Sequence, residues 1–159
     1  MENLILKSPG FENGNEIPSK YTCDGNPTSA FGGGGINPPL TIENVPANAR
    51  SLVLIMDDPD ATCGKTWDHW FLWNIAPETK EILENSVPSG AIQGKTSWNK
   101  NEYGGPCPPR GNPKHRYIFK LYALDIMLDL IPSASKDDLE KSMQGHILAQ
   151  TLLIGRYGR

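Results

Sequence analysis

Two histidines and a carboxylate in this sequence stand at the boundaries of apolar runs that are typical of buried strands. His69 and His115 each precede such a run, whereas Asp58 lies just past the end of one. If neighbouring strands are antiparallel, the end of one strand and the starts of its neighbours lie at the same edge of a sheet. Loops at such an edge are a common place for a binding site. We therefore expect Asp58, His69 and His115 to line one pocket.

Each of these residues also has a purely structural interpretation. Asp58 and Asp60 flank Pro59, and such a segment can simply begin a turn, because Asp bonds the backbone that follows it and Pro fixes φ. His69 could be a packed histidine with a satisfied ring nitrogen, and His115 could belong to a solvated basic corner. Taken singly, none of these residues identifies a function.

Two kinds of chemistry other than ligand binding are compatible with the same side chains. A hydrolase could use Asp58, His69 and His115 for acid–base catalysis, with Tyr117 as a further proton donor. A thiol nucleophile at Cys107 is a second form of that alternative, although Cys107 lacks the spacing of a known catalytic thiol and the chain has no Gly-x-Ser-x-Gly motif. Two histidines and a carboxylate can also bind a transition metal. We expect no catalytic activity, no metal and no cofactor.

Three nearly continuous apolar runs are predicted to form strands that are covered on both faces. They comprise residues 51–56, 70–75 and 116–124. Weaker strand signals lie at residues 4–7, 40–43, 92–96 and 151–154.

Glycine and proline mark two loops, at residues 32–35 with 38–39 and at residues 99–114. Trp67, Trp70 and Trp73 recur every three residues around the second apolar run, so each could belong either to the core or to a pocket wall.

One helix is indicated near the C-terminus. Ser135 can cap it, and Asp138, three residues further on, can return the hydrogen bond as in a capping box. Leu139, Met143 and Ile147 then recur every four residues and are expected to form its apolar face. The sequence therefore predicts a mainly β protein with a helix near the C-terminus.

Length and charge exclude several classes of protein. A chain of 159 residues fits a single domain over residues 1–159. The formal net charge is −3 and no long basic run occurs, so nucleic acid is not an expected partner. No apolar run approaches the roughly 20 residues of a membrane span.

The cellular compartment is expected to be the cytoplasm, because the N-terminal residues show no signal peptide. Cys23, Cys63 and Cys107 form an odd set without Cys-x-x-Cys spacing. In a cytoplasmic protein such cysteines are expected to be free thiols.

Several multi-residue motifs together resemble the phosphatidylethanolamine-binding protein family, and most closely its bacterial and archaeal branch described as Raf kinase inhibitor-like proteins. The motifs are Asp-Pro-Asp-Ala at 58–61, Trp-Asp-His-Trp-Phe-Leu-Trp-Asn-Ile at 67–75, Tyr-Gly-Gly-Pro-Cys-Pro-Pro at 103–109 and His-Arg-Tyr at 115–117. Further similarity lies at residues 11–14, 17–18, 24–25, 38–40 and 45–46, so the resemblance spans nearly the whole chain in the family's order.

The resemblance implies a β-sandwich-like fold around a large central antiparallel sheet, with an anion pocket at one edge, and a homodimer. The residues that it places in the pocket are Asp58, His69, Pro109, His115 and Tyr117, with Trp67, Ala61 and the backbone from Gly105 to Cys107 at the rim. Thr62 and Cys107 depart from the family's pattern, which usually has proline and often glycine at these positions.

An anion would suit these side chains. Imidazoles donate N–H groups and become cationic as the pH falls below about 6.5. Tyr117 can add its O–H, and backbone N–H groups around Gly105 can add neutral donors. Asp58 can fix a histidine tautomer or accept a hydrogen bond from a protonated phosphate or an ammonium group. We therefore expect a protein that binds a phosphate ester or a phospholipid head group, and that engages or inhibits a partner such as a kinase or a protease.

Overall fold

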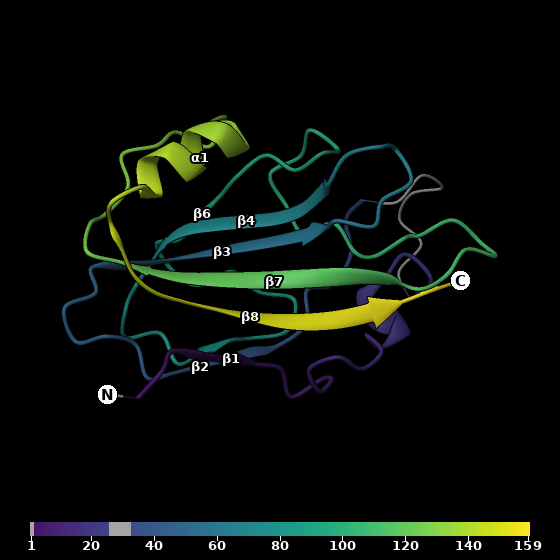
Figure 1. The fold of residues 1–159 in the computed structure, drawn as a ribbon, viewed down its shortest axis with the longest axis horizontal. Helices are drawn as coiled ribbons and strands as arrows, with labels where there is room; N and C mark the ends of the chain where they lie inside the picture. The colour runs from purple at the N-terminus through teal and green to yellow at the C-terminus, as the bar shows by residue number, and fades with distance from the viewer. Residues whose placement is uncertain (1, 26–32) are drawn as a thin grey trace.

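The larger of two β-sheets has five strands, and every neighbouring pair is antiparallel. In a computed structural model that describes residues 2–25 and 33–159, its strand order is β6-β4-β3-β7-β8 (Figure 1). In that order the strands span Ile92–Gln93, Trp67–Ile75, Ser51–Asp58, His115–Leu124 and Ile147–Tyr157. The C-terminal end of β3 therefore lies between the N-terminal ends of β4 and β7.

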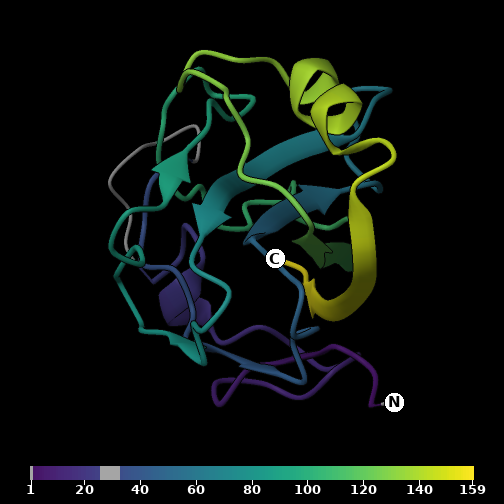
Figure 2. The same cartoon turned by 90° about the vertical axis from the view of Figure 1, so that its left-hand side faces the viewer.

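A smaller sheet of three strands faces one side of the larger sheet (Figure 2). Its order is β1-β2-β5, and its strands span Ile5–Lys7, Leu40–Glu43 and Glu81–Ile82. A short 3-10 helix at Ser19–Tyr21 lies between β1 and β2 in the chain. The prediction of a mainly β sandwich around a large antiparallel sheet is confirmed.

The main core lies between the two sheets. Leu52, Leu54 and Met56 alternate along β3, and all three are fully buried there against Leu6 and Ile42 of the smaller sheet. Alternation follows from the period of two that a strand imposes on its side chains.

The opposite face of β3 is covered as well. Val53 and Ile55 pack beneath helix α1 (Lys136–Met143), which contributes Leu139 and Met143 to this second core. Coverage on both faces explains why the run 51–56 is apolar without alternation.

Helix α1 begins as predicted and ends earlier. The Ser135 side chain accepts a hydrogen bond from the Asp138 N–H, and the Asp138 carboxylate accepts one from the Ser135 N–H, at 3.0 and 3.1 Å. The prediction that Ile147 belongs to the helix face is wrong. Gly145 adopts φ of 79°, a left-handed conformation that commonly ends a helix, and Ile147 begins β8 with 42% of its surface exposed.

The strand predictions differ from the structure in length. Strand β4 begins at Trp67, so His69 lies within the strand and not before it. Strand β8 exceeds the predicted 151–154, whereas the weak signal at 92–96 yields only the two residues of β6.

The two predicted loops lack helices and strands where the structure describes them. Residues 99–114 contain neither element, and the predicted loop at 32–35 falls within the described residues only from 33 onward. Among the described residues, no helix has the length and apolar character that a membrane span requires.

Candidate functional site

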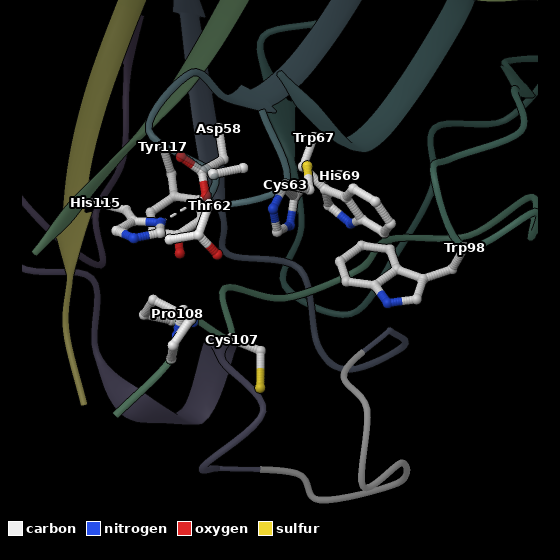
Figure 3. Close-up of a pocket in the computed structure, with 12 residues that line it drawn as sticks. Asp58, Thr62, Cys63, Trp67, His69, Trp98, Cys107, Pro108, His115 and Tyr117 are labelled. Carbon is white, nitrogen blue, oxygen red and sulfur yellow. Dashed lines mark hydrogen bonds and ion pairs between the residues drawn. The ribbon is translucent and has the colours of Figure 1, made fainter. Parts of the chain in front are cut away.

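A cavity of about 190 Å³ opens at the edge where β3 ends and β4 and β7 begin (Figure 3). Eight of the nine predicted site residues line it, together with four further residues. The eight are Asp58, Ala61, Trp67, His69, Cys107, Pro109, His115 and Tyr117, and the four are Thr62, Cys63, Trp98 and Pro108. That these residues bind a ligand stays a prediction.

Asp58 and His115 form a buried pair at the cavity wall. Nδ1 of His115 lies 2.8 Å from one Asp58 oxygen, and the other oxygen accepts the Asp60 N–H at 2.8 Å. Asp58 therefore both begins the turn and holds the histidine. Burial raises the pKa of Asp58, and the hydrogen bonds from His115 and from the Asp60 backbone oppose that change. With Asp58 ionised, Nδ1–H of His115 is the donor.

Asp60 belongs to the support of the cavity and does not line it. Its carboxylate accepts two hydrogen bonds from the Arg116 guanidinium and one from the Arg116 N–H, all at 2.9 Å. This bidentate pair lowers the pKa of Asp60 to about 2. It ties the turn after β3 to the second residue of β7.

An irregularity in the pairing of β3 with β4 places His69 at the cavity. Met56 pairs with Trp70, but Asp57 pairs with Asp68, which leaves His69 as an extra residue opposite the step between them. Such a bulge interrupts the alternation of side chains and re-aims the extra residue. His69 consequently joins Trp70 on the inner side of the sheet.

His69 presents a hydrogen-bond acceptor to the cavity. Its Nδ1 lies 2.6 Å from the Gly104 carbonyl oxygen, and because a carbonyl only accepts, Nδ1 carries the hydrogen. Nε2 then holds the lone pair in the neutral ring, and no described residue bonds it. Burial lowers the pKa of His69 to about 4. The expectation that both histidines are cationic donors is therefore wrong for His69.

Tyr117 adds a donor beside His69. It lies two residues after His115 on β7, hence on the same face, and its ring meets the His69 ring edge-on at 5.1 Å between centroids. No described residue bonds its hydroxyl group. Burial raises the pKa of Tyr117 well above its ordinary value, so the group keeps its proton.

The three tryptophans of β4 have different surroundings. Trp67 lines the cavity, whereas Trp70 lies in the core between the sheets and Trp73 in the core beneath α1. Trp98 stands edge-on to Trp67 and to His69, with centroids 5.6 and 5.0 Å apart. Trp98 precedes the predicted loop at 99–114, and nothing in its spacing distinguishes it.

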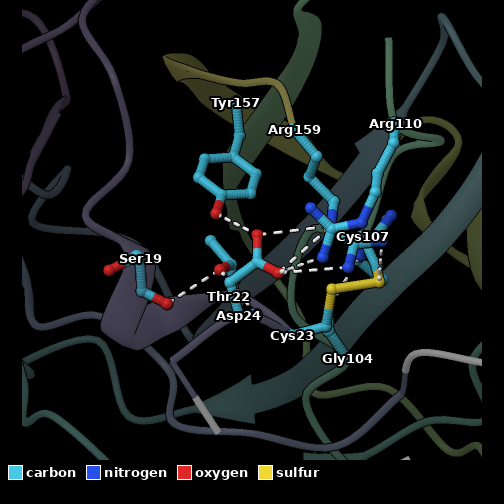
Figure 4. Close-up of a disulfide and its surroundings, with 10 residues drawn as sticks. Ser19, Thr22, Cys23, Asp24, Gly104, Cys107, Arg110, Tyr157 and Arg159 are labelled. Carbon is cyan, nitrogen blue, oxygen red and sulfur yellow. Dashed lines mark hydrogen bonds and ion pairs between the residues drawn. A yellow bond between two sulfur atoms is a disulfide. The ribbon is translucent and has the colours of Figure 1, made fainter. Parts of the chain in front are cut away.

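The prediction of free thiols is wrong for two of the three cysteines. Cys23 and Cys107 form a disulfide at the cavity rim, with Cα atoms 5.4 Å apart (Figure 4). The Cys23 N–H donates to the Pro106 carbonyl at 3.1 Å, which holds the two loops together although 84 residues separate the cysteines. Spacing in the sequence could not reveal that contact. The disulfide leaves Cys107 without the thiol that the nucleophile alternative requires, and Cys63 is an exposed free cysteine.

The basic side chains near the disulfide are already paired. Asp24 accepts hydrogen bonds from Tyr157 and Arg159, and Arg110 lies 3.8 Å from the same carboxylate (Figure 4). Arg116 is likewise paired, with Asp60. The described residues that line the cavity include no lysine or arginine.

Gly105 packs against the backbone of Tyr21 and does not point its N–H into the cavity. Its N–H donates to the Gly34 carbonyl at 3.0 Å, and a Cβ at this position would lie 2.6 Å from the Tyr21 carbonyl oxygen. The Gly104 N–H likewise donates to the His69 carbonyl at 2.9 Å. The N–H groups of Gly104 and Gly105 are therefore engaged within the protein, and Gly105 does not line the cavity, whereas Cys107 does. Within the described residues, no three histidine, cysteine or acidic side chains are grouped as metal ligands.

Comparison with known sequences gives a match over nearly the whole chain. Residues 7–158 match the family described as phosphatidylethanolamine-binding protein. A UPF0098 protein of Methanothermobacter thermautotrophicus is 46% identical over 161 aligned residues, which cover 98% of this chain and 99% of the relative. A UPF0098 protein of Aquifex aeolicus is 48% identical over 157 residues, covering 96% and 86%.

Comparison with solved structures agrees. The crystal structure of a phosphatidylethanolamine-binding protein homolog from Chlamydia trachomatis has a TM-score of 0.88 at 37% identity, covering 99% of this chain and 98% of that one. E. coli YbcL has a TM-score of 0.87 at 24% identity and 99% coverage of both chains, a likeness that concerns the fold alone.

Proposed function

Because this chain belongs to the phosphatidylethanolamine-binding protein family, we propose that its cavity binds a small anion, a phosphate ester or a phospholipid head group. One observation carries the proposal. The buried Asp58–His115 pair lies beside two side chains, His69 and Tyr117, whose cavity-facing polar atoms are bonded by no described residue. Because these atoms face an open cavity, they are available to bond a polar ligand.

The Asp58–His115 pair supplies the positive end of the site. Asp58 fixes Nδ1–H of the ring, so the proton that the imidazole gains lies on Nε2. In that form Nε2–H donates to the anion while Asp58 stabilises the imidazolium. Tyr117 O–H is the second donor.

Calorimetry with inorganic phosphate and phosphoethanolamine at pH 6 and pH 8 tests this proposal. We expect tighter binding at pH 6, because imidazole rings gain charge as the pH falls and a charged donor binds an anion more strongly. His115→Ala should weaken binding at least about tenfold, since it removes a charged donor. His146→Ala is the matched control, because this exposed histidine bonds Asp125 far from the cavity. Equal binding by both variants, or a flat pH profile, would contradict the assigned role.

We propose binding without turnover. Cys107 is bonded to Cys23, and no serine occurs among the described residues that line the cavity. The lining does include the hydroxyl group of Thr62 and the free thiol of Cys63, and neither is hydrogen-bonded to a histidine of the cavity.

The alternative is a hydrolase that uses Asp58, His69 and His115 for acid–base chemistry. Assays of phosphate-ester and peptide hydrolysis decide: turnover that His69→Ala abolishes would overturn the binding-only proposal.

The partner and the assembly are proposed on the family resemblance alone. We propose a cytoplasmic homodimer that engages a kinase or a protease, with the cavity receiving a phosphorylated side chain of that partner. Sedimentation velocity measures the first part, and a mass of about one chain across micromolar concentrations would contradict the dimer.

A further inference from the structure

We propose that the cavity selects the singly protonated monoanion of a phosphate monoester, with the P–OH of the ligand donating a hydrogen bond to Nε2 of His69. This inference rests on the proposed anion binding and adds the protonation state of the ligand. It concerns inorganic phosphate and phosphate monoesters alike, because both carry a titratable P–OH.

The tautomer of His69 is the first step. The Gly104 carbonyl, 2.6 Å from Nδ1, requires the hydrogen on that nitrogen and leaves the lone pair on Nε2. An oxygen that carries no hydrogen would meet this lone pair without any attraction. An O–H group would satisfy it. Nε2 cannot become a donor by a change of tautomer without losing the bond to Gly104, and burial, which lowers the pKa of His69, opposes the second proton that would make Nε2 a donor while keeping that bond.

The charge of the cavity is the second step. None of its described lining residues is a lysine or an arginine, and the nearby Arg116 and Arg159 are paired with Asp60 and Asp24. The charges of an ionised Asp58 and a protonated His115 sum to zero. Sites for phosphate dianions commonly use arginine to balance the charge. A monoanion fits this cavity better than a dianion does.

The acceptor at Nε2 of His69 and the low positive charge of the cavity together predict different affinities for ligands of equal charge. A phosphate monoester has a second pKa of about 6, so below that pH it carries one negative charge and one proton. A sulfate monoester and a phosphodiester also carry one negative charge, but neither has an acidic proton to donate. A phosphate monoester and a sulfate monoester have nearly the same shape, so a difference between their affinities reports the proton. A phosphodiester differs from both by its second alkyl group.

The test is calorimetric titration of the wild-type protein with methyl phosphate, methyl sulfate and dimethyl phosphate at pH 5.5. We expect methyl phosphate to bind at least about tenfold more tightly than the other two, because a site built around a hydrogen bond rejects analogues that lack it. Inorganic phosphate should bind with an affinity similar to that of methyl phosphate. If the site requires the ester group, methyl phosphate will bind more tightly than inorganic phosphate.

Raising the pH gives an independent arm. The ratio of methyl phosphate to methyl sulfate affinity should fall by up to about 50-fold between pH 6 and pH 8, as the dianion replaces the monoanion. The titratable groups around His69 are Asp57, Asp58, His115 and Tyr117. Asp57 is itself paired with Lys120 and Lys136. Their titration affects both ligands, and so it largely cancels in the ratio.

His69→Asn is the matched variant, because its side-chain N–H can still reach the Gly104 carbonyl while the acceptor at Nε2 is lost. We expect it to bind methyl phosphate and methyl sulfate equally. Equal binding of the three anions by the wild type would overturn this inference and leave the proposed function standing. Full discrimination by His69→Asn would overturn it as well. Failure of all the anions to bind would overturn both. The comparison of ligands on the wild type decides even if the variant does not fold.

Discussion

The hydrogen-bonding roles of Asp58, His69 and His115 are determined by contacts with neighbouring protein atoms. The Asp60 N–H and His115 share the two oxygens of Asp58, and the Gly104 carbonyl determines which His69 nitrogen carries the hydrogen. These outer contacts convert chemically ambiguous groups into a defined acceptor and defined donors. A carboxylate beside an anion is therefore no contradiction, because its charge is directed to the imidazole.

The buried state of His69 makes the stability of the protein depend on pH. The unfolded ring takes up a proton below its ordinary value of 6.5, whereas the folded ring does so only near its lowered pKa of about 4. Protons therefore favour the unfolded chain in this interval, and stability is present above pH 6.5 and lost as the pH falls towards 4. We expect the free energy of unfolding to fall by on the order of 2–3 kcal/mol from this group. Urea titrations at several pH values measure it.

His69→Asn should remove this contribution and flatten the dependence between pH 6.5 and pH 4. His146→Asn should follow the wild type, because His146 is exposed and lies outside the cavity. The carboxylates of the chain contribute equally to the pH dependence of unfolding in all three proteins. The same slope in His69→Asn as in the wild type would show that His69 is not held neutral in the folded protein.

At the scale of strands and loops, hydrophobic pattern explains what could be predicted. The runs 51–56, 70–75 and 116–124 are apolar because both faces of the large sheet are covered, and they place Asp58, His69 and His115 at one edge. The pattern does not encode contacts between distant loops.

The bulge opposite Asp57 and the pairing of Cys23 with Cys107 were therefore invisible in the sequence. Gly145 is a local signal that the periodicity of Leu139, Met143 and Ile147 concealed. The family resemblance supplied the identity of the cavity residues, whereas the tautomer of His69 required the position of the Gly104 carbonyl.

The disulfide should stabilise both the fold and the rim of the cavity. The bond closes a loop of 84 residues, and closing a long loop restricts the unfolded chain. Replacing Cys23 and Cys107 by serine should lower the free energy of unfolding by about 2–4 kcal/mol. It should also weaken binding of inorganic phosphate, since Cys107 lines the cavity. Urea unfolding and calorimetry measure the two effects.

Cys63→Ser is the control for this change, because Cys63 lines the same cavity but is exposed and has no disulfide partner. Its unfolding should match that of the wild type. Non-reducing mass spectrometry of the wild type should find two cysteines bonded and Cys63 free. Three reactive thiols in protein purified without reductant would contradict the disulfide.

At the scale of the whole molecule, the N-terminal segment completes the large sheet. Strand β8 lies at its edge, and residues 13–17 bond along that edge. The Gly14 N–H donates to Ile154, the Ile17 N–H donates to Arg156, and the Arg156 N–H donates to Asn15, at 2.7 to 2.9 Å. The same strand leads into Tyr157 and Arg159, which bind Asp24 beside the disulfide. Closure of this edge and the shape of the cavity rim are therefore connected.

Gly155 is the residue that allows this close approach. A Cβ on Gly155 would lie 2.3 Å from Cγ1 of Ile17, a fully buried side chain, and 2.9 Å from the Phe11 ring. Gly155→Ala should consequently lower the free energy of unfolding by about 1–3 kcal/mol through overpacking. Ile17→Ala creates space at the same point, so the double variant should lose less stability than the sum of the two single variants. Urea unfolding of the four proteins gives this coupling energy, and strict additivity would mean that Gly155 and Ile17 do not form the contact that joins the N-terminal segment to β8.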